Sequence, residues 1–83
     1  MSYWPAELTV ETLEADAVAA TGLDDFGDRD YREGLNVLLG DYRRHVRFDA
    51  AGAAGTRAML TGVLVQRLKA QHSLRQTRRA RIP

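Results

Sequence analysis

The chain has 83 residues, of which 45% are hydrophobic and 28% are charged, and it contains no cysteine. A chain of this length forms one small domain, which buries only about 60% of the surface that its unfolded form exposes. The lack of cysteine excludes disulfides, thiolate catalysis and cysteine-ligated zinc or iron–sulfur sites. No apolar run approaches the roughly 20 residues of a membrane span, and residues 1–5 lack the features of a signal peptide. We therefore expect a cytoplasmic protein with no membrane association.

The net charge of +1 conceals a strong polarity along the chain. Residues 1–30 carry eight acids and one arginine, a net charge of −7, whereas residues 57–83 carry seven bases and no acid, a net charge of +7. Such asymmetry predicts different neighbours for the two ends. Either the ends attract each other, within one fold or in a head-to-tail oligomer, or the basic end binds an external partner.

The first predicted helix begins after Thr9, whose hydroxyl oxygen is a good acceptor for an unpaired amide of the first turn. It ends at Gly22, which is suited to the left-handed conformation that closes many helices. One stripe of this helix is apolar but shallow, so its neighbour must approach closely; the stripe consists of Val10, Leu13, Ala17 and Ala20.

The second predicted helix is the most clearly amphipathic segment of the chain. Asp28 is its expected N-cap. At 100° per residue its apolar side chains fall on one face, formed by Tyr31, Leu35, Leu38, Leu39, Tyr42 and Val46.

A third helix is predicted to follow Asp49 as N-cap and to run to about Gln71. It is apolar on most of its circumference, and such helices are normally buried on most sides. Its interior glycines each cost about 1 kcal/mol relative to alanine, which close approach of another backbone would explain. Two short helices are too small to cover all of it, so we expect a partner to bind the leucine ridge Leu60, Leu64 and Leu68 and the flat stripe that includes Gly55 and Gly62.

Both ends of the chain supply further candidate contacts. Residues 1–74 form the predicted helical module, and residues 75–83 form a basic tail that either extends the third helix with a break or stays disordered until bound. Arg78, Arg79 and Arg81 are the tail residues expected to meet a partner. Trp4 is the candidate N-terminal anchor, although it also fits a role in closing the small core.

One segment resembles a known family. The stretch from Ala19 to Asp28 reads ATGLDDFGD after its first alanine, and Tyr31 to Leu35 continue it, followed by the pair Leu38–Leu39. It resembles the N-terminal helical segment of actinobacterial sulfotransferases that use 3′-phosphoadenosine 5′-phosphosulfate, over residues 8 to about 74. The resemblance implies a helical extension that lies against a catalytic domain and helps to shape its acceptor side.

The departure from that family limits what carries over. The catalytic domain of such enzymes opens with a phosphosulfate-binding loop containing proline and glycine, whose backbone amides hold phosphate, and this sequence has no such loop. No catalytic residue can be assigned here by resemblance. The chain stops near the point where the resemblance would place that domain.

The polar residues specify no catalytic or metal site. The acids between Asp24 and Glu33 lack the alternation of a calcium-binding loop and are explained by helix capping and turns. His45 and His72 lie on different segments, with no serine and acid placed to form a triad. We therefore expect no cofactor, no metal and no enzymatic activity of this chain alone.

These observations predict an all-α three-helix array, antiparallel because its connections are short, that acts as a non-catalytic interaction module. The expected partner is a sulfotransferase-like catalytic chain, another protein or a second copy. Two alternatives remain. The arginine-rich end could bind nucleic acid, although no aromatic residues interleave there, or the chain could be a fragment of a sulfotransferase-like enzyme.

Overall fold

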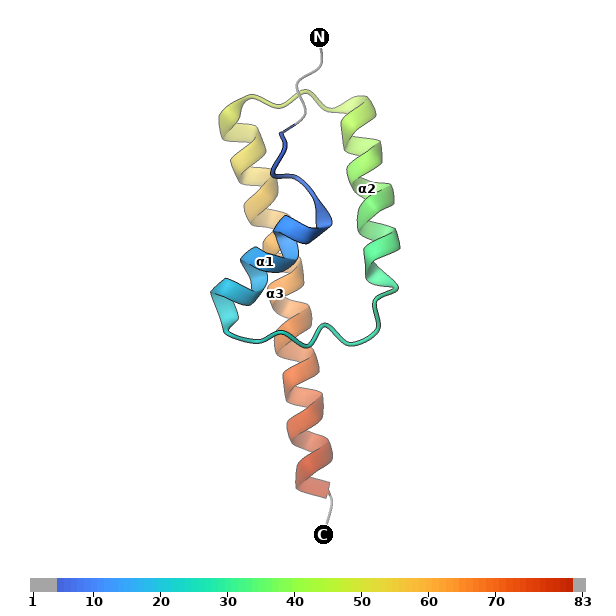
Figure 1. Ribbon diagram of the computed structural model, residues 1–83, viewed down its shortest axis with the longest axis vertical. Coiled ribbons are helices and arrows are strands. Elements are labelled where there is room, and N and C mark those ends of the chain that lie inside the picture. Colours follow the sequence, from blue (N-terminus) through green and yellow to red (C-terminus); the bar gives the residue numbers. More distant parts are fainter. Residues whose placement is uncertain (1–4, 82–83) are drawn as a thin grey trace.

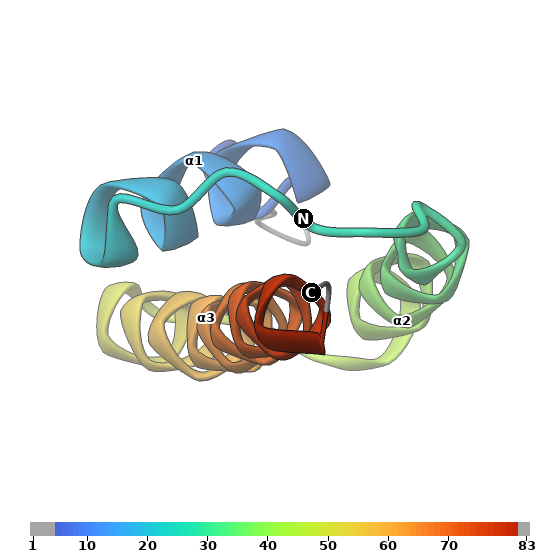
Figure 2. The ribbon, with the colours of Figure 1, turned by 90° about the horizontal axis from the view of Figure 1, so that it is seen from below.

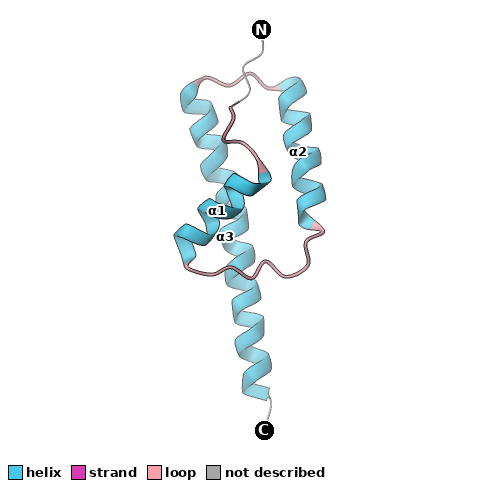
Figure 3. Ribbon diagram, in the orientation of Figure 1, coloured by secondary structure: helices cyan, strands magenta, loops and turns pink. Residues whose placement is uncertain are grey.

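A computed structural model of the protein describes residues 5–81, with side chains as far as Arg79. It contains three helices, α1 (Val10–Thr21), α2 (Tyr31–His45) and α3 (Ala50–Arg81), and the described part of the chain has no strand (Figure 3). The predicted all-α three-helix array is confirmed.

The helices form two thin layers. α2 runs antiparallel to α3 without a close backbone approach to it, and α1 crosses obliquely over α3 (Figure 1). Seen along the long axis, α1 forms one layer, and α2 and α3 form the other (Figure 2). The structure measures 60 × 22 × 14 Å, because the C-terminal part of α3 projects well beyond the other two helices (Figure 1).

The ends of α1 are those that the sequence predicts. Thr9 has an extended backbone, and its Oγ1 accepts a hydrogen bond from the Thr12 amide at 3.2 Å. Gly22 takes the left-handed conformation, with φ of 70°, and its amide donates to the Val18 carbonyl at 2.8 Å. Both ends therefore satisfy backbone groups that would otherwise lack partners.

The start of α2 lies later than predicted. The Asp28 carboxylate accepts a hydrogen bond from the Asp30 amide at 3.0 Å, as a capping residue would, but the helix begins at Tyr31. Residues 28–30 instead form a turn, in which the Arg29 carbonyl accepts from the Arg32 amide. Of the predicted apolar face, Leu35 and Leu39 are buried, whereas Val46 is 38% exposed.

The core lies where α1 crosses α3, and it contains the predicted leucine ridge. Leu60, Leu64 and Leu68 are at most 3% exposed, and they pack with apolar residues of α1, α2 and the preceding segments: Leu8, Val10, Leu13, Ala17, Phe26, Leu35 and Leu39. The prediction that this ridge lacks an internal cover is wrong. Residues 5–9 and the loop between α1 and α2 supply apolar side chains that a count of helices alone leaves out.

α3 is longer than predicted. Its N-terminus is capped by Asp49, whose Oδ1 accepts from the Gly52 amide at 2.7 Å, as expected. The helix then continues to Arg81 with no break at position 75, past the predicted end near Gln71. Residues 71–81 contain no glycine or proline and are rich in arginine and glutamine, which favour helix.

Candidate functional site

A shallow open groove of about 470 Å³ lies on α3 beside α1. Small side chains dominate it, because Ala54, Ala58 and Gly62 recur every four residues and so lie above one another on the helix. The full lining is Asp16, Ala54, Arg57, Ala58, Thr61, Gly62, Val65 and Gln66. A surface of this shape allows another helix backbone to approach closely.

An ion pair between α1 and α3 forms the edge of this groove. Arg57 Nε lies 2.6 Å from Asp16 Oδ2, and the second Asp16 oxygen accepts from Arg57 Nη2 at 2.9 Å. This paired geometry fixes the orientation of both planar groups. The hydrogen bond from Arg57 lowers the pKa of the Asp16 carboxyl below its usual value. The groove therefore has one charged, ordered wall in an otherwise apolar surface.

Thr61 adds an unpaired polar atom to the same groove. Its Oγ1 is buried and has no hydrogen-bond partner among the described residues. By contrast, the hydroxyls of Thr21 and Thr77 each donate to the carbonyl four residues earlier, at 2.9 and 3.0 Å. A buried hydroxyl without a partner is energetically unfavourable.

The two glycines predicted to bind a partner, Gly55 and Gly62, lie on the surface of α3. A Cβ added at either position would meet no atom within 4 Å. The close approach expected at these glycines is therefore not made by any described part of this chain. Gly62 lines the groove, whereas Gly55 does not.

The remaining predicted partner contacts fall in different places. Leu60, Leu64 and Leu68 belong to the core and are not accessible to a partner. Arg78 and Arg79 are exposed on the projecting end of α3, and Arg81 is its last residue. Trp4 lies outside the described residues. The structure thus does not bring the predicted contacts together into one site.

A second group of contacts, which the sequence did not reveal, holds the loop between α1 and α2 against α3. Arg67 donates from Nε to the Phe26 carbonyl and from Nη2 to the Asp28 carbonyl, both at 2.6 Å. Its guanidinium also lies 4.5 Å from the ring centre of Tyr31, which in turn stacks on Phe26 at 5.7 Å. One arginine thereby fixes the segment that carries the family-like motif.

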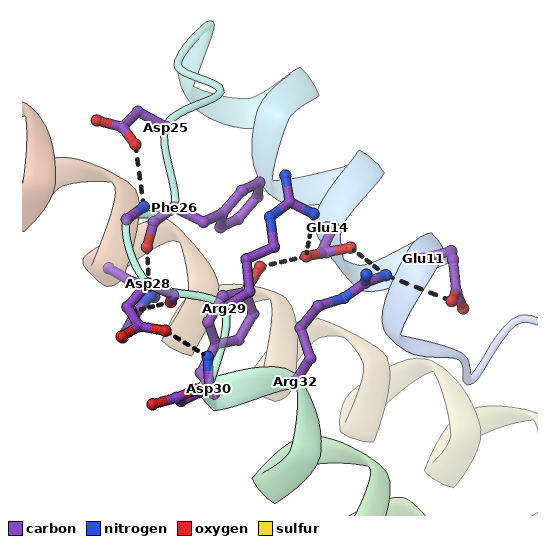
Figure 4. Close-up of polar contacts among 11 residues, drawn as sticks. Glu11, Glu14, Asp25, Phe26, Asp28, Arg29, Asp30 and Arg32 are labelled. Atoms are coloured by element: carbon purple, nitrogen blue, oxygen red, sulfur yellow. Dashed lines mark hydrogen bonds and ion pairs between the residues drawn. The ribbon is translucent and has the colours of Figure 1, made fainter.

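Glu14 of α1 anchors the start of α2 in the same region (Figure 4). Its carboxylate accepts from the Tyr31 hydroxyl and lies 3.1 Å from Arg32 Nη2 and 3.9 Å from Arg29 Nη1. Burial of the phenol, with the hydrogen bond to Glu14, raises the pKa of Tyr31 to about 12. These contacts join α1 to the start of α2.

No signal in the sequence distinguishes Arg67 from the other basic residues near the C-terminus. What distinguishes Arg67 is the loop between α1 and α2, which lies beside it and accepts its two hydrogen bonds. The path of that loop depends on how α1 and α2 pack, which the sequence alone does not give. The pairing of Asp16 with Arg57 likewise joins residues 41 positions apart and depends on the crossing of α1 and α3.

Two further searches of the described residues gave no site. No group of three or more histidine, cysteine or acidic side chains in residues 5–81 is arranged to hold a metal ion. Within the same range, every helix is too short or too polar to cross a membrane.

The chain was also compared with known proteins. No protein-family model, no curated protein and no solved structure matches it. The groove and the exposed end of α3 are therefore interpreted from their own geometry.

Proposed function

We propose that this protein is a non-catalytic helical interaction module that receives a helix of a protein partner in the groove beside Ala58 and Gly62. The observation that carries this proposal is the groove itself, an open apolar surface of small residues to which no described part of the chain packs. Small residues at every fourth position let two helix backbones approach closely, which increases van der Waals contact.

Two features favour a helix over a small ligand as the occupant. The groove is open, whereas small molecules bind in clefts that enclose most of their surface. Its small residues run along α3 for about two helical turns, from Ala54 to Gly62, and so form an extended track.

The candidate partner is the catalytic chain of a sulfotransferase-like enzyme. The resemblance of residues 8 to about 74 to the helical segment of such enzymes supports this choice, and it implies that the segment lies against a catalytic domain. Two helices that lie side by side bury a modest area, so the affinity should be in the micromolar range.

The test uses a sulfotransferase catalytic domain stripped of its own helical segment as the probe, with binding measured by titration calorimetry. Gly62→Leu puts a large side chain into the groove, and its Cβ would meet no atom within 4 Å, so the variant should fold and fail to bind. Ala70→Leu, on an exposed position of α3 outside the groove, is the matched control and should bind like the wild type. Equal binding by Gly62→Leu and wild type, or no binding by wild type, would count against the proposal.

Nucleic-acid binding is the second candidate, and one observation favours it: Arg78 and Arg79 are exposed on a projecting helix and form no ion pair with any described residue. Against it stand the exposed acids at the base of this helix, Asp24, Asp28 and Asp30, which would repel phosphates. We expect any duplex binding to be no tighter than about 10 μM at physiological salt, within the ordinary non-specific range.

A further inference from the structure

The distal segment of α3, residues 70–81, projects beyond α1 and α2 (Figure 1), and near its start Gln71 and Arg75 contact the loop between α1 and α2. Every described side chain from His72 to Arg79 is exposed. Leu74, near its centre, is 51% exposed, although leucine is usually buried. This segment is therefore a helix with one large apolar side chain and no cover within the described chain.

Opposite charges are exposed at the two ends of this segment. Near its tip, Arg78 and Arg79 form no ion pair with any described residue. At its base lies the acidic loop, defined as residues 24–30, in which the carboxylates of Asp24, Asp28 and Asp30 are exposed and likewise form no ion pair with the described residues. The fourth carboxylate, of Asp25, is already paired with Arg75 at 2.7 Å.

The exposed charges of the acidic loop and of the tip are not paired with each other in the described chain. The acidic loop is fixed to α3 by the hydrogen bonds of Arg67, and it also packs closely on Gln71. A Cβ added to Gly27 of the loop would lie only 2.7 Å from the Gln71 side chain. The loop reaches as far along α3 as Arg75, which pairs with Asp25, and Arg78 lies three residues further, about 4.5 Å along the helix. Arg78 and Arg79 are thus left at the exposed end of the segment, where the acidic loop of a second molecule can reach them.

We propose that the distal segment binds a second copy of this chain, with the two segments antiparallel and a two-fold axis beside Leu74. In such a pair, positions equally far from the axis lie opposite each other. Arg78 of one copy therefore lies at the height of residues 70–71 of the other, where the acidic loop contacts α3. The unpaired charges of both copies are satisfied together, and each Leu74 covers the other.

The rotational positions agree with this arrangement. At about 100° per residue, Arg78 lies roughly 40° from Leu74 around the helix, and Gln71 lies roughly 60° from Leu74 in the same direction. A two-fold axis perpendicular to both helices keeps Arg78 of one copy and Gln71 of the other on the same side of the pair. The arginine of each copy therefore faces the acidic loop of the other rather than the opposite face.

The expected dimer is weak and sensitive to salt. With the axis beside Leu74, residue 81 of one copy lies opposite residue 67 of the other, so the overlap spans only residues 67–81. This is well below the extent of an obligate interface, and the charged contacts are exposed. We expect a dissociation constant on the order of 10–100 μM at low ionic strength, with at least several-fold weakening when salt is raised.

A charge exchange tests the proposal, with mass measured by sedimentation equilibrium up to about 1 mM protein, well above the expected dissociation constant. One variant carries Arg78→Glu and Arg79→Glu, and the other carries Asp24→Arg and Asp28→Arg. All four positions are exposed, so both variants should keep the helical circular dichroism of the wild type. Each variant alone should be monomeric, because like charges then face each other, and an equimolar mixture should form a heterodimer.

Three outcomes would overturn the proposal. In the first, the wild type stays monomeric at the highest concentration in low salt. In the second, the mixture of the two variants does not associate. In the third, each variant alone still forms a dimer. Submicromolar binding of the wild type to a short DNA duplex, lost with Arg78→Glu and Arg79→Glu and without self-association, would assign this surface to nucleic acid instead. Gly62→Leu, which fills the groove proposed above for a different partner, should leave the dimer unchanged, so the two proposals fail separately.

Discussion

The two halves of α3 differ in what surrounds them, although both are regular helix. From Ala50 to Leu68 the helix buries a leucine at every fourth position from Leu60 onward, and each is at most 3% exposed. Beyond Leu68 the same spacing reaches His72 and Gln76, and both are exposed. The first half is stabilised by packing in the core, whereas the second half extends the backbone hydrogen bonding of the first. The body of the protein therefore ends where the leucine repeat ends.

The distal half remains helical because the folded half provides its nucleus. An isolated helix of about a dozen residues is marginal in water, since the first turn is costly to form. Here that turn already exists at Leu68, and each further residue adds one backbone hydrogen bond. Arg67 and Arg75 also tie the loop between α1 and α2 to this junction.

Removing one leucine from each half gives the largest expected contrast. Leu64→Ala should lower the free energy of unfolding by about 3 kcal/mol, because it removes a 2%-exposed side chain from the core and leaves a cavity. Leu74→Ala makes the same chemical change at a 51%-exposed position and should change stability by less than about 0.5 kcal/mol. Urea denaturation at low protein concentration, where no dimer forms, measures both. Equal losses for the two variants would show that the distal half packs against something in the monomer.

A matched pair of arginines gives an intermediate contrast at the junction. Arg67→Met keeps most of the side-chain stem but removes two hydrogen bonds to backbone carbonyls and the contact with the Tyr31 ring. We expect a loss of about 2 kcal/mol, typical of hydrogen bonds from a charged donor.

Arg75→Met removes an ion pair whose side chains are 66% and 33% exposed, and solvent screening limits such pairs to below about 1 kcal/mol. Near-ultraviolet circular dichroism of the tyrosines should change with Arg67→Met and stay constant with Arg75→Met. A spectrum unchanged by Arg67→Met would contradict the role assigned to this arginine in fixing the loop.

Local signals in the sequence were sufficient to predict the three helices, both ends of α1 and the start of α3. Thr9 and Gly22 each form a capping hydrogen bond with a residue at most four positions away, and the cap of α3 at Asp49 is equally local. The start of α2 was placed too early because Asp28 and Asp30 are both good capping residues, and the contacts that decide between them lie on α1 and α3. The pairing of Tyr31 with Glu14, 17 residues away, is one such contact.

The candidate surfaces were harder to predict because burial depends on tertiary arrangement. Periodicity correctly separated the leucine ridge from the small-residue stripe on α3, but it could not say which of them faces the core. The sequence assigned both to a partner, whereas Leu8 and Phe26, which lie outside the helices, help to bury the ridge. α3 is also longer than predicted, because residues 71–81 continue the helix although they bury little apolar surface. Residues 71–81 are helical with Leu74 as their one large exposed hydrophobic residue among the described side chains.

The smallest expected effect concerns glycine and separates the groove from the loop. Gly62→Ala should raise the free energy of unfolding by about 0.5–1 kcal/mol, because alanine has the higher helix propensity and its Cβ meets no atom within 4 Å. Gly27→Ala should have the opposite sign, because Gly27 has φ of 72° and a Cβ there would lie 2.7 Å from the Gln71 side chain. Thermal unfolding of both variants at low concentration measures the difference. If Gly62→Ala were destabilising, another backbone would have to pack at Gly62 within the monomer, and the groove could not be free to receive a partner.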